Sequence, residues 1–221
     1  MSNLASYIDH TLLKPDATIY DIQKLLGETK QYGFSSACFA PCWLDERIDK
    51  YLDTITISSV VGFPHGNVQT GTKINQMQNG SDEYDVVANI GDIKSGKWSD
   101  VEFEIMKLRG ATKRAIKYIV EIGYLTDPEL FRVAELLIKY KIDYIKTCTG
   151  FGPRGVTVDD VKKIKSFCGD RIKIKASGGI KTASFAEDLI AAGASRLGIG
   201  SSSSLEIISG KGGLPNNGKE Y

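Results

Sequence analysis

Lys146, Lys175 and Asp85 are charged residues that stand inside β-prone, largely apolar stretches of sequence. Burial destabilises an ammonium group unless its pKa falls, and a lysine with a lowered pKa is a nucleophile toward carbonyl groups. A second lysine close by would lower the pKa of the first from its usual value of about 10.4 toward neutrality. These residues therefore predict Schiff-base chemistry at Lys146, in which Asp85, through a water and Lys175, moves the proton of a substrate hydroxyl.

The same residues also have a purely structural interpretation. Lys146 would then be a strand-edge lysine whose long side chain reaches solvent. Asp85 would be a buried carboxylate that only pairs with a lysine. The residue types alone leave both interpretations open.

Eight β-prone runs alternate with helical stretches at intervals of roughly 25 residues. The expected strands are 6–10, 36–40, 55–61, 84–90, 116–121, a short run that begins at Asp143 and contains Lys146, 171–176 and 195–199. The helices between them are expected at about 18–32, 44–52, 72–79, 99–114, 126–140, 158–167, 182–192 and from 201 onward, and the first of them has either Asp16 or Thr18 as its cap. A loop through Gly91 and Gly96 is expected after the fourth strand.

This alternation predicts an α/β fold, specifically a single (β/α)8 TIM barrel over residues 1–208. Residues 209–221 are rich in Gly, Pro and Asn and are expected to form a flexible C-terminal tail. A doubly wound sheet is the alternative, but its glycine fingerprint is missing after the first expected strand.

A barrel would bring the charged residues together. Catalytic residues of such barrels come from the carboxyl ends of the strands. Side chains alternate along a strand, so Lys173 and Lys175 share one face, and Asp85 shares a face with Val87 and Asn89. The barrel interior is the place where Lys146, Lys175 and Asp85 can meet and satisfy one another's charge.

Glycines after the seventh and eighth expected strands indicate a phosphate site. Gly178 and Gly179 follow the seventh strand, and Gly200 and Ser201 follow the eighth. Barrels commonly bind phosphate there, with backbone N–H groups and a helix N-terminus. Each pair alone is weak evidence, because glycines are also common turn residues. Together they predict a phosphorylated small-molecule substrate.

Composition and charge argue against several other classes of function. The chain has 221 residues, 42% hydrophobic and 25% charged, with a formal net charge of +1. Its basic residues form no block, so binding to nucleic acid or to a membrane surface has no electrostatic support. No apolar run approaches the roughly 20 residues of a membrane span, and the N-terminus lacks the pattern of a signal peptide. We expect a cytoplasmic protein.

The cysteines and histidines suggest neither a disulfide framework nor a metal site. The four cysteines are irregularly spaced, and Cys38-x3-Cys42 has no matching pair that would complete a metal site. His10 and His65 lie in different segments, where we expect them to form hydrogen bonds in the barrel mouth or its loops. Cys38 is expected to be a small buried residue. We therefore expect no metal, no cofactor and a reduced compartment.

Six segments carry a resemblance to a known family: 8–15, 61–66, 82–87, 89–91, 144–152 and 175–180. Through them, from about Tyr7 to Ile208, the sequence resembles the deoxyribose-phosphate aldolase family of class I, Schiff-base aldolases. The resemblance implies that Lys146 forms the Schiff base, that Lys175 perturbs it and relays protons, and that Asp85 is the proton donor and acceptor.

The resemblance also implies the reaction, the reversible cleavage of 2-deoxy-D-ribose 5-phosphate to acetaldehyde and D-glyceraldehyde 3-phosphate in deoxynucleoside catabolism. It places Cys38 near the substrate and Thr149 and Gly150 among the residues that bind the substrate or its phosphate. A homo-oligomer, dimer or tetramer, is implied as well. Family members commonly end in a tyrosine, and we hypothesise that Tyr221 assists proton transfer at the enamine carbon. A disordered tail is the plain alternative.

Two departures from the family pattern stand out. The stretch 73–79 is about one helical turn shorter than usual, and Cys148 stands where serine is commoner. Another Schiff-base aldolase, of the transaldolase or fructose-bisphosphate type, is the nearest alternative. A non-catalytic barrel that binds sugar phosphates is a second, but it would not need both lysines and Asp85.

Overall fold

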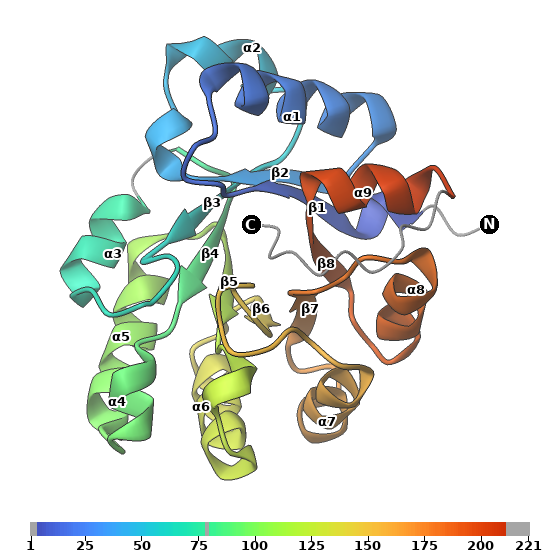
Figure 1. The fold of residues 1–221 in the computed structure, drawn as a ribbon. Coiled ribbons are helices and arrows are strands. Elements are labelled where there is room, and N and C mark those ends of the chain that lie inside the picture. Colours follow the sequence, from blue (N-terminus) through green and yellow to red (C-terminus); the bar gives the residue numbers. More distant parts are fainter. Residues whose placement is uncertain (1–3, 78–79, 211–221) are drawn as a thin grey trace.

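A closed barrel of eight parallel strands forms the centre of the molecule (Figure 1). The structure, a computed structural model, describes residues 4–77 and 80–210. The strands follow the chain order around the barrel: β1 (Ile8–Leu12), β2 (Ser36–Phe39), β3 (Ile57–Val61), β4 (Glu83–Val87), β5 (Ala115–Ile119), β6 (Tyr144–Lys146), β7 (Lys173–Ser177) and β8 (Arg196–Gly200). β8 pairs with β1 and closes the barrel. The prediction of a (β/α)8 barrel is confirmed, and the open doubly wound sheet is excluded.

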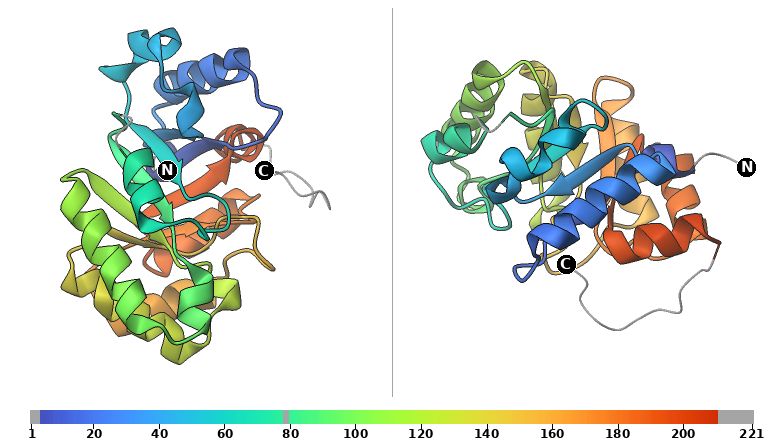
Figure 2. Two further views of the ribbon diagram at one scale, coloured as in Figure 1. Left: turned by 90° about the vertical axis from the view of Figure 1, so that its left-hand side faces the viewer. Right: turned by 90° about the horizontal axis from the view of Figure 1, so that it is seen from above.

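The helices surround this barrel (Figures 1 and 2). They are α1 (Ile19–Tyr32), α2 (Asp49–Leu52), α3 (Thr70–Gln76), α4 (Ile90–Lys94), α5 (Trp98–Ala111), α6 (Asp127–Lys139), α7 (Val158–Cys168), α8 (Ala183–Ala191) and α9 (Ser201–Ile208). Short 3-10 helices occur at η1 (Leu4–Tyr7), η2 (Pro41–Trp43), η3 (Glu46–Ile48) and η4 (Ile122–Tyr124). Within the described ranges, no helix has the length and apolar character needed to cross a membrane.

Local sequence signals set several helix ends. Thr18 and Asp21 form a capping box at the start of α1, and Gly33 ends this helix in the left-handed conformation, with φ 68°. Thr157 and Asp160 form the same kind of box at the start of α7. Because such caps involve only neighbouring residues, these helix ends lie close to where the sequence predicted them.

The hydrophobic core lies between the barrel wall and the helices. Ile174 and Ala176 of β7 and Tyr84 and Val86 of β4 are buried in this core. Side chains alternate along a strand, so the residues between them, including Lys175, point into the barrel. The barrel interior therefore receives the charged residues, as the sequence predicted.

Several elements differ from their predicted bounds; the fourth strand, for example, ends at Val87 and not at residue 90. The first strand begins at Ile8 and not at residue 6, because residues 4–7 form η1. The helix predicted at 44–52 is broken into η3 and α2. In this segment Asp45 caps η3 through the Arg47 N–H, which starts a tight turn where a continuous helix was expected.

The loop predicted through Gly91 and Gly96 was wrong, because it contains α4. Asn89 Nδ2 donates a hydrogen bond to Asp92 Oδ2 at 2.5 Å, and the buried Ile93 attaches the turn to the core. The helix predicted at 72–79 is α3. Residues 78–79, the tail prediction from 211 onward and the hypothesis on Tyr221 lie outside the described residues.

Candidate active site

Lys146, Lys175 and Asp85 meet inside the barrel, as their spacing predicted. Lys146 ends β6 and is the register partner of Lys175 on β7. Asp85 Oδ2 accepts hydrogen bonds from Lys146 Nζ at 2.7 Å and from Lys175 Nζ at 2.6 Å. Asp85 and Lys175 are fully buried, whereas Lys146 keeps 4% exposure. One carboxylate oxygen thus contacts both lysine side chains directly.

Lys117 and Asp9 extend this cluster, and sequence reasoning missed both. Lys117 Nζ lies 3.2 Å from Asp85 Oδ1 and 3.0 Å from Asp9 Oδ2. Lys175 Nζ also contacts Asp9 Oδ2, at 2.5 Å. The signal that identified Lys146, a charged residue inside a β-prone run, was equally present at Lys117 in the fifth strand.

Burial and pairing separate the pKa values of the two candidate lysines. Burial lowers the pKa of Lys146; Asp85 opposes the shift, and the Lys175 ammonium adds to it. Burial would lower the pKa of Lys175 as well, but the carboxylates of Asp85 and Asp9 together outweigh burial and raise this pKa. The sequence interpretation named both burial and the second ammonium as causes of a lowered pKa, and burial is the larger of the two. Lys146 is thus the better nucleophile of the pair.

Asp85 remains ionised in this environment. Burial would raise its pKa, but Lys117, Lys146 and Lys175 outweigh burial and hold the pKa well below its usual range. An ionised carboxylate in contact with the attacking amine is placed to accept a proton.

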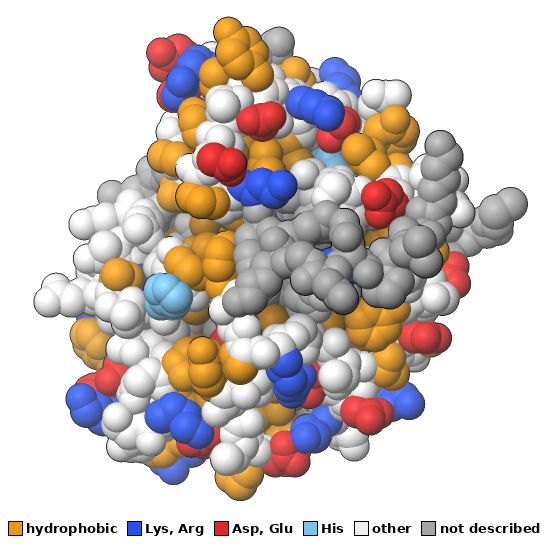
Figure 3. Space-filling view, in the orientation of Figure 1, with side chains coloured by type: hydrophobic (Ala, Val, Ile, Leu, Met, Phe, Trp, Pro, Cys, Tyr) orange, Lys and Arg blue, Asp and Glu red, His pale blue; other side chains and the backbone are white. Residues whose placement is uncertain are grey.

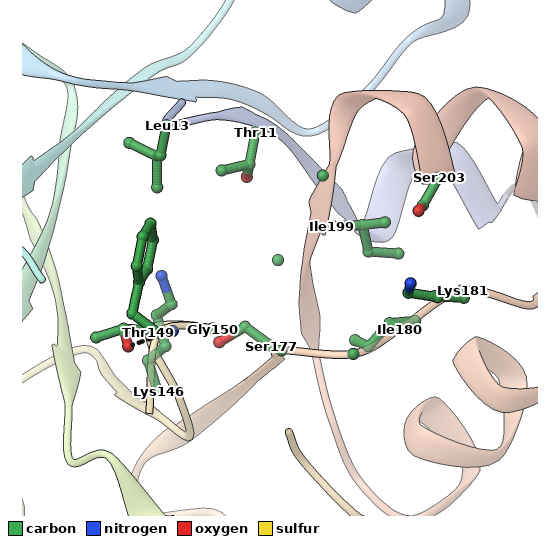
Figure 4. Close-up of a pocket in the computed structure, with 15 residues that line it drawn as sticks. Thr11, Leu13, Lys146, Thr149, Gly150, Ser177, Ile180, Lys181, Ile199 and Ser203 are labelled. Carbon is green, nitrogen blue, oxygen red and sulfur yellow. Dashed lines mark hydrogen bonds between the residues drawn. The ribbon is translucent and has the colours of Figure 1, made fainter. Parts of the chain in front are cut away.

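A cavity opens beside Lys146 at the carboxyl ends of the strands (Figure 4). Figure 4 shows Lys146 and Thr149 on one side of it and Ile199, Lys181 and Ser203 on the other. Five of the candidate binding residues line it: Thr149, Gly150, Gly178, Gly179 and Gly200. Sequence reasoning missed further residues that line it, among them Thr11, Leu13, Ser177, Lys181 and Ser203.

Curated relatives identify the family of this barrel. No family model matches the chain. The deoxyribose-phosphate aldolase of Thermoanaerobacter sp. (strain X514) is 41% identical over 215 residues, which cover 93% of this chain and 96% of that protein. The chain belongs to the deoxyribose-phosphate aldolase family. The resemblance found in the sequence is thereby confirmed.

Solved structures of this aldolase family share the fold. The crystal structure of a putative deoxyribose-phosphate aldolase from Coccidioides immitis superposes with a TM-score of 0.89 at 32% identity, covering 95% of this chain and 85% of that one. A deoxyribose phosphate aldolase from Aeropyrum pernix, described as having a unique tetrameric structure, superposes with a TM-score of 0.84 at 30% identity. The match covers 94% of this chain and 91% of that one.

Two residues that sequence reasoning assigned to the aldolase site, Ser201 and Cys38, do not line the cavity. Ser201 lines a separate cavity, bounded also by Lys24 and Glu28 of α1. As the first residue of α9, it faces α1 outside the barrel. Cys38 is fully buried and is not among the residues that line the aldolase cavity. Burial raises the pKa of its thiol, so Cys38 fits the small buried residue that the sequence also suggested.

The loop after β6 is held by Glu121, which sequence reasoning did not single out in this aldolase barrel. Glu121 Oε2 accepts hydrogen bonds from the Thr149 hydroxyl and, at 3.1 Å, from the Thr149 N–H. Thr149 Oγ1 in turn accepts one from the Phe151 N–H at 3.0 Å. Thr149 therefore braces the edge of the cavity through both its backbone and its side chain.

Close backbone packing fixes the other side of this loop. A Cβ on Gly155 would lie 2.5 Å from the carbonyl oxygen of Gly178, so only glycine fits at position 155. Gly178 itself has φ 91°, a conformation that L side chains rarely adopt. The two strand-end loops that border the cavity thus support each other.

His10 does not lie in the barrel mouth of this aldolase, which corrects the sequence expectation. Because Asp9 points into the barrel, its neighbour His10 points outward. There it stacks on Phe34, and its Nε2 lies 3.0 Å from Glu28 Oε2. His65 is exposed in the loop after β3, as expected, and lines a further cavity there. Over residues 4–77 and 80–210, no group of three or more His, Cys, Asp or Glu side chains is placed to hold a metal ion.

Proposed function

We propose that this chain catalyses the reversible cleavage of 2-deoxy-D-ribose 5-phosphate to acetaldehyde and D-glyceraldehyde 3-phosphate through a Schiff base on Lys146. The observation that carries this proposal is the position of Lys146. Among the described residues, it is the lysine that both belongs to the buried charged cluster and lines the cavity. Membership of the deoxyribose-phosphate aldolase family supplies the substrate.

In the proposed mechanism, the free amine of Lys146 attacks the C1 aldehyde of the open-chain sugar. Loss of water then gives a protonated Schiff base, which draws electrons from the bond between C2 and C3. That bond breaks as the C3 hydroxyl loses its proton, which releases D-glyceraldehyde 3-phosphate and leaves an enamine on Lys146. Protonation at C2 and hydrolysis release acetaldehyde and restore the amine.

Asp85 is the proposed acceptor of the C3 hydroxyl proton, with Lys175 sharing the proton. The positive charge on the Lys146 nitrogen disappears when the Schiff base becomes an enamine. Because the Lys146 cation is one of the charges that hold the pKa of Asp85 down, its loss makes the carboxylate more basic. The proton affinity of Asp85 thus rises at the step in which the hydroxyl must lose its proton.

The phosphate is proposed to bind at the other end of the cavity. Gly178 and Gly179 line this end and turn with φ 91° and 77°, a conformation that favours glycine. Gly200 precedes the N-terminus of α9, whose dipole attracts anions. The Lys181 side chain lines the same end and supplies a positive charge.

The class I, metal-independent character of the enzyme is part of the proposal. Its support is chemical, because an iminium ion on Lys146 can act as the electron sink for carbon-carbon cleavage.

We also propose a homo-oligomer, since the Aeropyrum pernix relative is described as tetrameric. All four cysteines are free thiols, which fits the proposed reduced, cytoplasmic setting. Figure 3 shows acidic and basic side chains intermingled on the displayed face, a pattern unlike that of a nucleic-acid binding surface.

Product analysis tests this function. Purified protein given 2-deoxy-D-ribose 5-phosphate should release acetaldehyde and D-glyceraldehyde 3-phosphate, and the activity should persist in a metal chelator. A transaldolase-type or fructose-bisphosphate-type enzyme would instead act on ketose phosphates and leave deoxyribose phosphate unchanged. Binding without turnover of either substrate would indicate a non-catalytic barrel.

A further inference from the structure

The charged cluster continues from the active site to the opposite end of the barrel. Arg196 and Glu83 are the first residues of β8 and β4, so they lie at the amino-terminal end of the barrel. Arg196 Nε donates to Asp9 Oδ1 at 2.7 Å, and its Nη2 donates to Glu83 Oε2 at 2.7 Å. Glu83 Oε2 lies 2.5 Å from Lys117 Nζ. These contacts connect the amino-terminal end of the barrel to the charged residues next to the cavity.

Six of these side chains form a closed ring in which anions and cations alternate. Its members, in order, are Asp85, Lys175, Asp9, Arg196, Glu83 and Lys117, and Lys117 returns to Asp85. Three carboxylates and three cations make the ring electrically neutral. Lys146 contacts this ring through Asp85 but is not a member of it. A proton on Lys146 therefore adds a positive charge that no carboxylate of the ring balances.

Other titratable groups face this part of the barrel without changing that balance. They are Cys38 on β2, Tyr144 on β6, Lys173 on β7, Glu121 after β5 and, across the cavity, Lys181. Burial raises the pKa of the Cys38 thiol, which keeps it neutral. Lys173 is exposed and lies over the Tyr144 ring, where solvent screens its charge. Glu121 is turned to the loop after β6 through its bonds to Thr149.

We propose that this ring sets the protonation state of the nucleophile, and that Arg196 and Glu83 act on Lys146 as remote positioning residues through the charge balance of the ring. The inference rests on the proposed function of Lys146. Without the Arg196 charge the ring is negative, so a proton on Lys146 becomes favourable. Without the Glu83 charge the ring is positive, so the free amine becomes more favourable.

Four variants test the ring: Arg196→Met, Glu83→Gln, the double variant and Arg196→Lys. The measurement is the pH dependence of kcat/KM and of the rate at which borohydride traps substrate on Lys146. The rate falls as pH drops through the pKa of Lys146, because the protonated amine cannot attack. We expect this fall in rate, the acid limb of the profile, to shift to higher pH by roughly one unit in Arg196→Met, which is a tenfold loss of free amine below the pKa. In Glu83→Gln the acid limb should shift to lower pH by a similar amount.

The double variant and Arg196→Lys separate charge from structure. The double variant restores a neutral ring, so its acid limb should return to within about 0.3 pH units of the wild-type position. Arg196→Lys keeps the charge but loses the paired donors, so its limb should stay in place even if the protein is less stable. If Arg196→Met does not fold, the other single variants still test the ring, because the acid limb should move to lower pH in Glu83→Gln and stay in place in Arg196→Lys.

Acid limbs that stay in place in Arg196→Met and Glu83→Gln, or that move in the same direction, would overturn the proposal. Such a result would leave the aldolase function intact, because trapping of substrate on wild-type Lys146 tests that function separately. Absence of trapping on the wild-type protein would instead refute the proposed function itself.

Discussion

Removal of the Lys175 charge should raise the pKa of Lys146. Lys146 Nζ and Lys175 Nζ lie 2.7 and 2.6 Å from the same oxygen of Asp85, so the two nitrogens are within about 5 Å of each other. Two unit charges at that separation repel by ~3 kcal/mol at an effective dielectric constant of about 20, which corresponds to roughly two pKa units. In Lys175→Met the free-amine fraction of Lys146 should fall about 100-fold at pH values below its wild-type pKa.

The assay is the pH profile of kcat/KM for cleavage of deoxyribose 5-phosphate. The acid limb should move up by about two pH units, and activity should recover only in part at high pH, because the proton relay is lost as well. Lys173→Met is the matched control. Lys173 lies two residues earlier on the same strand and is exposed, so its removal should move the limb by less than about 0.3 units. An acid limb of Lys175→Met in the wild-type position would refute this reasoning.

Three further predictions follow from the same structure. Lys146→Ala should abolish cleavage while circular dichroism shows an unchanged fold; measurable turnover in that variant would contradict the mechanism. Gly155→Ala should raise the KM for the sugar phosphate and lower stability by about 1–3 kcal/mol, since the new Cβ would press on the Gly178 carbonyl; a wild-type KM and urea midpoint would contradict this. Folding lowers the pKa of Asp9, because its cationic neighbours outweigh burial, so its ionised form stabilises the protein above about pH 4 and this contribution is lost as pH falls further. Urea unfolding at pH 6 and pH 3 should therefore show a steeper loss of stability in wild type than in Asp9→Asn.

The barrel could be predicted from the sequence because its signals are local. Each β-prone run ends in glycine or polar residues, and caps such as Thr18 and Gly33 mark helix ends within a few residues. The inward direction of Lys175 and Asp85 follows from alternation along a strand, which needs no tertiary information. The same rule applied to Lys117 and Asp9 would have found the rest of the cluster.

Other features depend on contacts between distant segments and were not predictable in this way. Ser201 follows a strand like the phosphate-site glycines, but the packing of α9 beside α1 decides which cavity it lines. Glu121 reaches Thr149 across 28 positions of sequence, so its role in the loop appears only in the folded chain. The relative weight of burial and of Lys175 in the pKa of Lys146 likewise depends on the folded environment.

The most direct test of the account is the intact mass of the protein after incubation with deoxyribose 5-phosphate and borohydride, which reduces a Schiff base to a stable amine. The account predicts an adduct on wild-type protein that peptide mapping places on Lys146, and none on Lys146→Ala. An adduct that maps to Lys175, or one that forms equally on Lys146→Ala, would contradict it.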